Sequence, residues 1–286
     1  MIRRVMHDGT PPVDMRRSGV RREECSADEV GGVATVGSVK RTVQVVAKDG
    51  ATLRVHLQGD STRPAVVQLS GGPGYVAYLA DTEWCCPAFV ITPEARGVGG
   101  SAGNAHDLAQ AIADLEDIRD HLALDSWAVV GHSWGADLGL FYALAHPERV
   151  RVLVHVCGRG VQNDRDWSAA YHAAKDNDLS PAGDPFPYPY STEVHAELLR
   201  SWRQWIKRPQ LWREIAGCSA RVIVVVAGND IRPSWPNAQL AEALPYGEYV
   251  VVPDAHHDFW AAPGQAWCEK VQRPAVEVDA AHPAGP

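Results

Sequence analysis

The sequence predicts an α/β protein with a mostly parallel central sheet, helices on both faces of the sheet and an inserted helical cap. Two observations support this fold class. Short valine-rich runs alternate with segments in which apolar residues recur every three or four positions, and strands that alternate with helices form parallel sheets. One later stretch keeps the helical spacing but has no strand pattern. The length of 286 residues suits one large domain.

The first elements are predicted to be a hairpin and two buried strands. Residues 43–46 and 53–57 have the composition of strands, and Lys48-Asp49-Gly50 between them is a turn sequence, so the two should pair antiparallel. Residues 65–69 and 88–91 are short apolar runs of the kind found in strands that are buried on both faces.

The middle of the chain alternates between helix and strand. Leucine and isoleucine recur at helical spacing over residues 107–122, which predicts a helix. An apolar strand at 127–130 follows, then an amphipathic helix at 136–145 that ends before a proline, and a further strand at 150–156. This order predicts consecutive parallel strands connected by helices.

The pattern changes over residues 158–217, which are rich in tryptophan and have no strand signal. We interpret this stretch as the helical cap. The alternation then resumes with a strand at 222–227, a helix at 237–244 and a last strand at 248–252. The sheet should therefore continue on the far side of the insertion.

These elements divide the chain into four regions. Residues 1–38 carry mixed charge without periodicity and are predicted to be a loosely ordered extension. The core should comprise 39–157 and 218–272, with the cap at 158–217. Residues 273–286 are rich in proline and are predicted to be a disordered tail.

Composition excludes several classes of function. The net charge of −8 and the lack of a basic cluster argue against nucleic-acid binding. No apolar run approaches the ~20 residues of a membrane span, and no apolar segment follows the first arginines as in a secretory signal, so we expect a cytoplasmic protein without a membrane partner. The six cysteines lack metal-type spacing and are expected to be reduced, without a metal or cofactor. Nothing in the sequence indicates an oligomeric state.

The stretch Gly131-His132-Ser133-Trp134-Gly135 is the strongest functional signal. It stands between a predicted strand and a predicted helix. In that context the glycines allow a sharp turn that presents the Ser133 hydroxyl at a helix N-terminus, where backbone N–H groups favour negative charge. This arrangement predicts a serine nucleophile.

A nucleophilic serine needs a base and an acid that orients the base, and in such sheets they follow in the order acid, then histidine. Asp230 comes directly after the strand at 222–227, where active sites of parallel sheets lie. His256 and His257 follow the last strand. Asp254 and Asp258 flank the histidines and are less favoured alternatives for the acid, because either would have to reach back across a tight loop.

Four stretches carry a resemblance to a known family. They are Ser70-Gly71-Gly72-Pro73-Gly74, Glu94-Ala95-Arg96-Gly97-Val98-Gly99-Gly100-Ser101, Ser133-Trp134-Gly135 and Asp254-Ala255-His256-His257-Asp258-Phe259-Trp260. They resemble the H-G-G-P-G, D-x-R-G-x-G-x-S, S-W-G and D-A-G-H-x-x-W motifs of the α/β-hydrolase family, and more narrowly of its prolyl-iminopeptidase-like branch. The resemblance implies an α/β-hydrolase fold and aligns His257 with the catalytic histidine.

The resemblance also implies roles for residues. Ser133, His257 and Asp230 would be nucleophile, base and orienting acid, and the N–H groups of Trp134 and of Gly72, or of its neighbour Gly71, would bind the oxyanion. The candidates for the substrate pocket are Gly71, Pro73, Trp167, Trp202 and Trp205.

Three functions stay open at this point. The first is a prolyl-iminopeptidase-like aminopeptidase that acts on short peptides or small amides. The second is a carboxylesterase or lactonase, which is favoured by His132 in place of the branch's glycine and by a cap with equal numbers of acidic and basic residues. The third is a protein that uses a hydrolase pocket only for binding, which the complete set of Ser133, Asp230 and His257 disfavours. Ser70 and Glu94 also depart from the family pattern, which has histidine and aspartate there.

Overall fold

The computed structural model describes residues 40–162, 164–178, 180–183, 186–262 and 264–277. The predicted extension at 1–38 and the end of the predicted tail, 278–286, lie outside the described residues. Eight strands form one sheet in the order β1-β2-β4-β3-β5-β6-β7-β8. Their bounds are β1 Lys40–Val46, β2 Thr52–Gln58, β3 Ala65–Leu69, β4 Phe89–Pro93, β5 Trp127–His132, β6 Val150–Val156, β7 Arg221–Ala227 and β8 Gly247–Val252.

The sheet is parallel from β4 to β8, and only β2 pairs antiparallel with its neighbours β1 and β4. The hairpin of β1 and β2 is in the predicted position, with Val43 opposite Val55. β5 lies inside the sheet between β3 and β6. The predicted fold class is therefore confirmed, and the strand that leads into Ser133 lies among the central strands.

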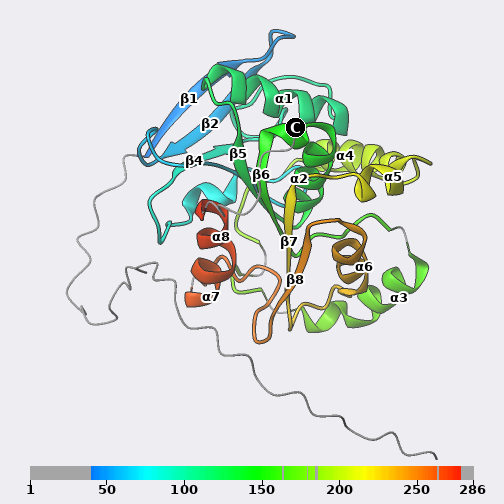
Figure 1. Ribbon diagram of the computed structural model, residues 1–286. Coiled ribbons are helices and arrows are strands. Elements are labelled where there is room, and N and C mark those ends of the chain that lie inside the picture. The colour runs from blue at the N-terminus through cyan, green and yellow to red at the C-terminus, as the bar shows by residue number, and fades with distance from the viewer. Residues whose placement is uncertain (1–39, 163, 179, 184–185, 263, 278–286) are drawn as a thin grey trace, which may run out of the picture. The chain divides into compact units, whose positions relative to one another are not determined.

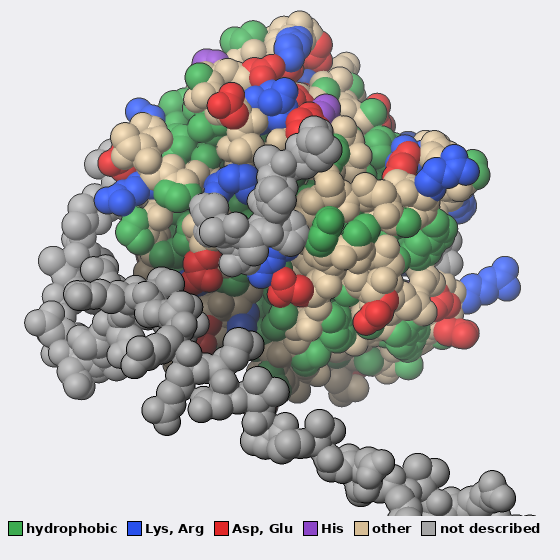
Figure 2. Space-filling model, in the orientation of Figure 1, with side chains coloured by type: hydrophobic (Ala, Val, Ile, Leu, Met, Phe, Trp, Pro, Cys, Tyr) green, Lys and Arg blue, Asp and Glu red, His purple; other side chains and the backbone are tan. Residues whose placement is uncertain are grey.

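Helices cover both faces of the sheet (Figure 1). They are α1 Leu108–His121, α2 Trp134–Ala145, α6 Trp235–Ala243, α7 Gln265–Trp267 and α8 Arg273–Val276, with the short turns η1 Tyr78–Asp81, η2 Pro147–Arg149 and η4 Cys268–Gln272. None of the helices in the described residues is both long and apolar enough to cross a membrane. On the face shown in Figure 2, acidic and basic side chains are interspersed and neither gathers into one patch.

Side chains of the central strands alternate between two cores. On β5, Val129 packs with the helices α1, α2 and α6, whereas Ala128 and Val130 pack on the opposite face with residues of η1 and of the C-terminal helices. Both sets are buried. This burial on two faces explains why the parallel strands appear in the sequence as continuous apolar runs.

The connection between β6 and β7 holds the segment interpreted as the cap. It contains α3 Arg165–Ala174, η3 Lys175–Asn177, α4 Thr192–Trp205 and α5 Leu211–Ala216. Val194, Leu198 and Trp202 lie on one side of α4 and join the core on the α1 and α2 face. The Leu108 N–H donates to Ser201 Oγ at 2.9 Å, so α4 also satisfies a backbone group at the start of α1.

The predicted tail begins too early. Residues 273–276 form α8, and Ala275 is 1% exposed in the core on the η1 side of the sheet. The prolines of the tail predict disorder, but Pro274 lies in α8, which continues directly from η4.

The expectation of reduced cysteines is wrong for two of them, because Cys85 and Cys268 form a disulfide. The C-terminal helices fold back against the segment before β4. Gln272 joins the same two segments by hydrogen bonds. The Cys85 N–H donates to Gln272 Oε1 at 3.0 Å, and Gln272 Nε2 donates to the Glu83 carbonyl at 2.7 Å. Residues 183 positions apart are thus brought together, and cysteine spacing along the chain could not show it.

Breaking this disulfide is expected to lower the free energy of unfolding. The loop-entropy relation gives roughly 5 kcal/mol for a loop of 183 residues. Urea unfolding of the protein with and without reductant, and of Cys85→Ser/Cys268→Ser, measures the loss. Cys86→Ser is the matched control, because the Cys86 thiol is free. Equal unfolding midpoints for the oxidised protein, the reduced protein and the double variant would contradict the expectation.

Candidate active site

Ser133 stands in a strained turn between β5 and α2, with φ 55° and ψ −122°. The glycines on either side are required by close approach. A Cβ on Gly131 would lie 2.2 Å from the Gly135 carbonyl oxygen, and a Cβ on Gly135 would lie 2.0 Å from the Leu69 carbonyl oxygen. The motif therefore allows the turn that the sequence predicts, and a positive φ at a residue other than glycine is typical of a functional site.

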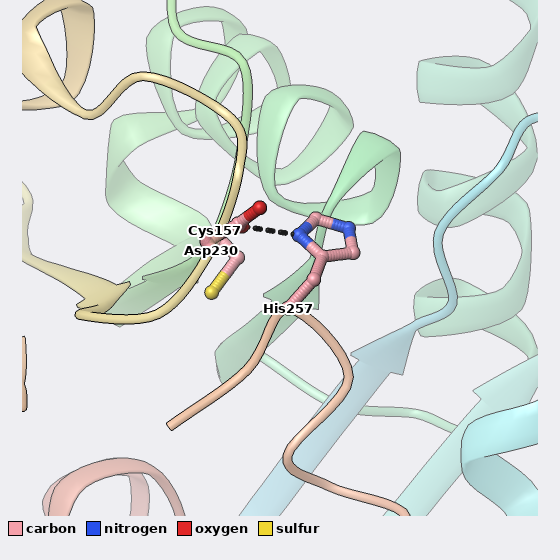
Figure 3. Close-up of side chains that lie close together, drawn as sticks. All are labelled: Cys157, Asp230 and His257. Atoms are coloured by element: carbon pink, nitrogen blue, oxygen red, sulfur yellow. Dashed lines mark hydrogen bonds and ion pairs between the residues drawn. The ribbon is translucent and has the colours of Figure 1, made fainter. Parts of the chain in front are cut away.

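The structure brings Ser133, His257 and Asp230 together in a line of hydrogen bonds. The Ser133 hydroxyl lies 3.1 Å from His257 Nε2. His257 Nδ1 lies 2.5 Å from Asp230 Oδ2, the bond that Figure 3 shows. Three separate elements supply the residues, namely the end of β5 and the loops after β7 and β8. All three sit at the carboxyl ends of parallel strands, the edge at which such sheets bind ligands.

Asp230 is buried but strongly held in its charged form. Burial raises the pKa of its carboxyl, but the charge and hydrogen bond of His257, together with the charge of Arg232, outweigh this effect and lower the pKa to about 2. Arg232 donates to Asp230 Oδ1 from its backbone N–H at 2.9 Å and from Nη1 at 3.0 Å. The carboxylate thus stabilises the fold above its ordinary pKa of 3.8, and this contribution is lost as the pH falls through about 2.

The other members of the histidine loop have different positions. His257 is the histidine whose ring reaches Ser133, whereas His256 is its half-buried neighbour. Asp258 is 4% exposed, and its Oδ2 accepts from the Ser180 hydroxyl and, at 3.0 Å, from the Ala182 N–H. Asp254 is exposed. Of the candidate acids, Asp230 is thus the one bonded to His257.

Two backbone N–H groups are the candidates for the oxyanion site. Trp134 is the first residue of α2, so its N–H has no partner within the helix. Gly72 has a φ of 54° and lines the cavity that holds Ser133 and His257. The N–H of Gly71, by contrast, donates to the Tyr78 hydroxyl at 2.5 Å. Gly71 lies so close that an added Cβ would be 2.6 Å from Ser133 Cβ.

The cap supplies much of the cavity wall around Ser133. The lining of this cavity includes aromatic and charged side chains. The aromatic ones are Tyr75, Tyr78, Tyr171 and Phe186, and the charged ones are Lys175, Asp178, Arg232 and Asp258. Hydrogen bonds join the Gly71–Gly74 loop to the cap, from Ser191 N–H to the Gly74 carbonyl at 2.8 Å and from Val76 N–H to the Pro189 carbonyl at 3.2 Å. His195 Nδ1 lies 2.8 Å from the Pro73 carbonyl.

The prediction that three tryptophans line the substrate pocket is wrong for the cavity that holds Ser133. Within the described residues, the lining of the Ser133 cavity does not include Trp167, Trp202 or Trp205. Trp167 stacks on Tyr171 and donates to a backbone carbonyl. Trp202 is 1% exposed in the core, and Trp205 packs edge-on against Phe141. Large aromatic side chains gain most by burial, and Trp167 and Trp202 are buried while Trp205 is half-buried against the core.

The remaining two pocket candidates occupy a neighbouring space. Gly71 and Pro73 line an apolar crevice beside the Ser133 cavity, together with Trp134, Leu138 and the cap residue Leu198. Gly72 lines both spaces. The glycine loop therefore forms the wall between them.

Sequence reasoning missed several side chains of the site. Arg232 bridges Asp230 to the cap, because its Nη2 lies 3.2 Å from Asp178 Oδ2. Tyr78 and His132 are buried directly behind the site and bonded to each other. The sequence did mark His132 as unusual, because the prolyl-iminopeptidase-like branch has glycine at that position. No local pattern in the sequence indicates a role for Tyr78.

One group of possible metal ligands also comes together. Ligand atoms of Cys157, Asp230 and His257 lie within 4.8 Å of one another, and Figure 3 shows them at the ends of neighbouring strands. The sequence predicted no metal. The bond of His257 Nδ1 to Asp230 already uses two of the three groups, and burial raises the pKa of the Cys157 thiol, which keeps it protonated.

The fold and the site define a class of protein: an α/β sheet that carries a nucleophile turn at a central strand, with a histidine and a carboxylate on later loops. The model of the family described as "alpha/beta hydrolase fold" matches residues 64–214, more than half of the chain. The chain belongs to this family.

Curated relatives are proline iminopeptidases. The chain is 40% identical over 103 residues to a probable proline iminopeptidase of Streptomyces coelicolor, a match that covers 32% of each protein. It is 33% identical over 112 residues to the proline iminopeptidase of Arabidopsis thaliana, covering 37% of this chain and 30% of that protein. The matches thus span only about a third of the relatives' length.

Solved structures with the same fold include two esterases. Naproxen esterase from Bacillus subtilis aligns with a TM-score of 0.62 and 14% identity over 83% of this chain and 92% of that one. A thermophilic esterase from Thermogutta terrifontis aligns with a TM-score of 0.60 and 19% identity over 78% and 94%. At these identities the likeness supports the fold alone.

Proposed function

We propose that the protein is a serine hydrolase that cleaves an amide or ester through an acyl-enzyme, with Ser133 as nucleophile, His257 as base and Asp230 as orienting acid. The observation that carries the proposal is the unbroken line from Ser133 Oγ through the His257 ring to Asp230 Oδ2. With the His257 proton on Nδ1, each bond in that line has the polarity that the chemistry requires.

The proposed mechanism follows from these contacts. Ser133 Oγ attacks the substrate carbonyl while its proton passes to His257 Nε2, and the ionised Asp230 stabilises the resulting imidazolium. The N–H groups of Gly72 and Trp134 donate to the oxyanion. His257 then gives the proton to the leaving group, and water attacks the acyl-enzyme with His257 again as base. Loss of one oxyanion donor raises such barriers by ~2.7–4 kcal/mol.

For the substrate we propose a small molecule or short peptide, and for the activity a prolyl-iminopeptidase-like aminopeptidase. The similarity of this chain to the proline iminopeptidases of Streptomyces coelicolor and Arabidopsis thaliana supports that assignment. No cofactor has a role in the proposed chemistry.

A carboxylesterase or lactonase is the second candidate, and the carboxylates near the site favour it. An aminopeptidase must hold the substrate's ammonium group. In the described part of the cavity, Asp178 is paired with Arg232, and Asp258 accepts from Ser180 and Ala182. On α4, Glu197 is paired with His106 at 2.9 Å. Each of these carboxylates already has a partner within the chain.

One substrate panel separates the candidates. Proline and alanine arylamides are assayed beside short-chain aryl esters, with Ser133→Ala as the blank. Faster cleavage of proline arylamides than of matched esters supports the aminopeptidase, whereas turnover of esters alone supports the esterase. Binding of these compounds without turnover by the wild type would refute the hydrolase proposal.

Asp230→Asn is expected to lower kcat by about 10⁴-fold, as the equivalent change does in a well-studied triad. Asparagine keeps the shape of the hydrogen bond but favours the wrong tautomer of His257. Initial rates of the variant measure the loss, and Asp258→Asn and Asp254→Asn are the matched controls. A near-normal rate for Asp230→Asn, with a large loss in either control, would move the acid to the histidine loop.

The predicted cytoplasmic location stays a prediction. The Cys85–Cys268 bridge bears on it, since disulfides persist mainly in oxidising compartments. The thiol content of protein taken from the cell under conditions that block thiol exchange decides whether the bridge is present there.

A further inference from the structure

A second chain of hydrogen bonds runs behind the proposed catalytic line. The Gly71 N–H donates to the Tyr78 hydroxyl at 2.5 Å, that hydroxyl lies 2.6 Å from His132 Nδ1, and His132 Nε2 lies 2.8 Å from the His257 carbonyl oxygen. Tyr78 is 3% exposed and His132 is 2% exposed. Both polar side chains are therefore shielded from water, where an unmade bond is costly.

For a neutral His132, only one arrangement of protons satisfies all three contacts. The His257 carbonyl can only accept, so the proton of His132 must be on Nε2, and Nδ1 must be an acceptor. The Tyr78 hydroxyl then donates to His132 Nδ1, which leaves its oxygen to accept from Gly71. Burial and the neighbouring His257 lower the pKa of His132 to about 3, so the imidazole is neutral, as this arrangement requires.

The chain connects the three segments that carry the proposed chemistry. Gly71 adjoins Gly72, the proposed oxyanion donor, and touches the Cβ region of Ser133. His132 is the last residue of β5, next to Ser133. The third contact is to the backbone of His257 itself. Each bond therefore fixes one segment relative to another, although none of them reaches the reacting atoms.

The Tyr78 hydroxyl is fully used in this role. Its ring lines the cavity and stacks on Trp260 with centroids 4.7 Å apart. Its oxygen accepts from Gly71 and donates to His132, and burial raises the pKa of the hydroxyl. Replacing Tyr78 by phenylalanine removes the oxygen and keeps the ring, so it tests the hydrogen bonds of the hydroxyl separately from the packing of the ring.

We propose that Tyr78 and His132 are positioning residues, which hold the oxyanion loop and the His257 loop in register with Ser133. The inference rests on the proposed function, because the segments it aligns are those of the proposed nucleophile, base and oxyanion donor. Misplacement of reacting groups by about 1 Å costs about 10²-fold in rate. The effect of losing the hydroxyl should therefore fall on kcat more than on KM.

The first test is Tyr78→Phe, with Tyr188→Phe as the matched control. Tyr188 belongs to the same aromatic cluster, with its ring 5.6 Å from that of Tyr78, but within the described residues its hydroxyl bonds to Asp81 alone. We expect about 10- to 10²-fold slower labelling by a fluorophosphonate and a matching fall in kcat, with KM within twofold. Tyr188→Phe should keep both rates within twofold. Equal rates for Tyr78→Phe and wild type overturn the proposal.

The second test compares His132→Gln with His132→Ala, and it decides the matter if Tyr78→Phe does not fold. Glutamine has an acceptor and a donor at its end and can replace both ring contacts, so it should recover at least tenfold of the rate that alanine loses. Equal loss in the two folded variants overturns the proposal, as does a ¹⁵N NMR spectrum that places the His132 proton on Nδ1. A wild type that the probe does not label refutes the hydrolase function itself, whereas a labelled wild type with unaffected variants refutes only the positioning role.

Discussion

Replacing Ser133 by alanine is expected to abolish turnover while leaving the fold intact. Loss of the nucleophile lowers kcat by about 10⁶-fold in a serine protease with the same three groups. The hydroxyl contributes one bond, to His257, and alanine retains the Cβ that packs against Gly71. Initial rates measure the loss, and circular dichroism with thermal unfolding shows whether the fold is kept.

A fluorophosphonate probe gives an independent measure of the same residue. The wild type should be labelled at Ser133, and the label should be lost in Ser133→Ala. Ser180→Ala is the matched control, because Ser180 also lines the cavity but bonds to Asp258. Labelling that survives in Ser133→Ala, or that is lost only in the control, would assign the nucleophile elsewhere.

The second large effect is expected at His257. His257→Ala should lower kcat by about 10⁶-fold, as removal of the triad histidine does elsewhere, because no other group is bonded to Ser133 Oγ in the described residues. His256→Ala is the neighbouring control and should change kcat by less than tenfold, since its ring is outside the line from Ser133 to Asp230. Single-turnover assays of acylation measure the loss at the step in which the base takes the proton.

The reverse ranking of the two histidine variants would show that the loop adopts another register in the active protein. Such a result would also remove Asp230 as the orienting acid, because its only bond to the catalytic groups passes through His257 Nδ1.

The sequence was informative wherever a local pattern has one physical cause. The central parallel strands are buried on both faces, and continuous valine-rich runs such as 222–227 show that directly. The turn at Ser133 needs glycine at 131 because the Gly135 backbone lies close by, and at 135 because the backbone of Leu69, at the end of β3, does. Asp230 and the pair His256 and His257 were found from their places after strands, since the fold gathers strand ends at one edge, and the family resemblance singled out His257 of the pair.

Features that depend on distant contacts could not be predicted in this way. A tryptophan pattern indicates burial but not which cavity or core receives the ring, and Trp202 lies in the core. Asp137 lies in the first turn of α2, and its carboxylate accepts from the distant Arg159 and Gly160 N–H groups at 3.1 and 3.0 Å. The partner of Tyr78 is 54 residues away, and no spacing rule connects the two.

The bonds between the Gly71–Gly74 loop and the cap limit how this molecule can admit its substrate. The Gly74 carbonyl and the Pro73 carbonyl are both engaged by residues at the start of α4. If the cap swung outward as a rigid lid, it would pull on the segment that carries the Gly72 N–H. Opening the cavity and dismantling the oxyanion site would then be one event. We therefore expect substrate to reach Ser133 through an opening that exists while the cap is in place, so that the width of this opening, and not a swing of the cap, would limit the size of the substrate.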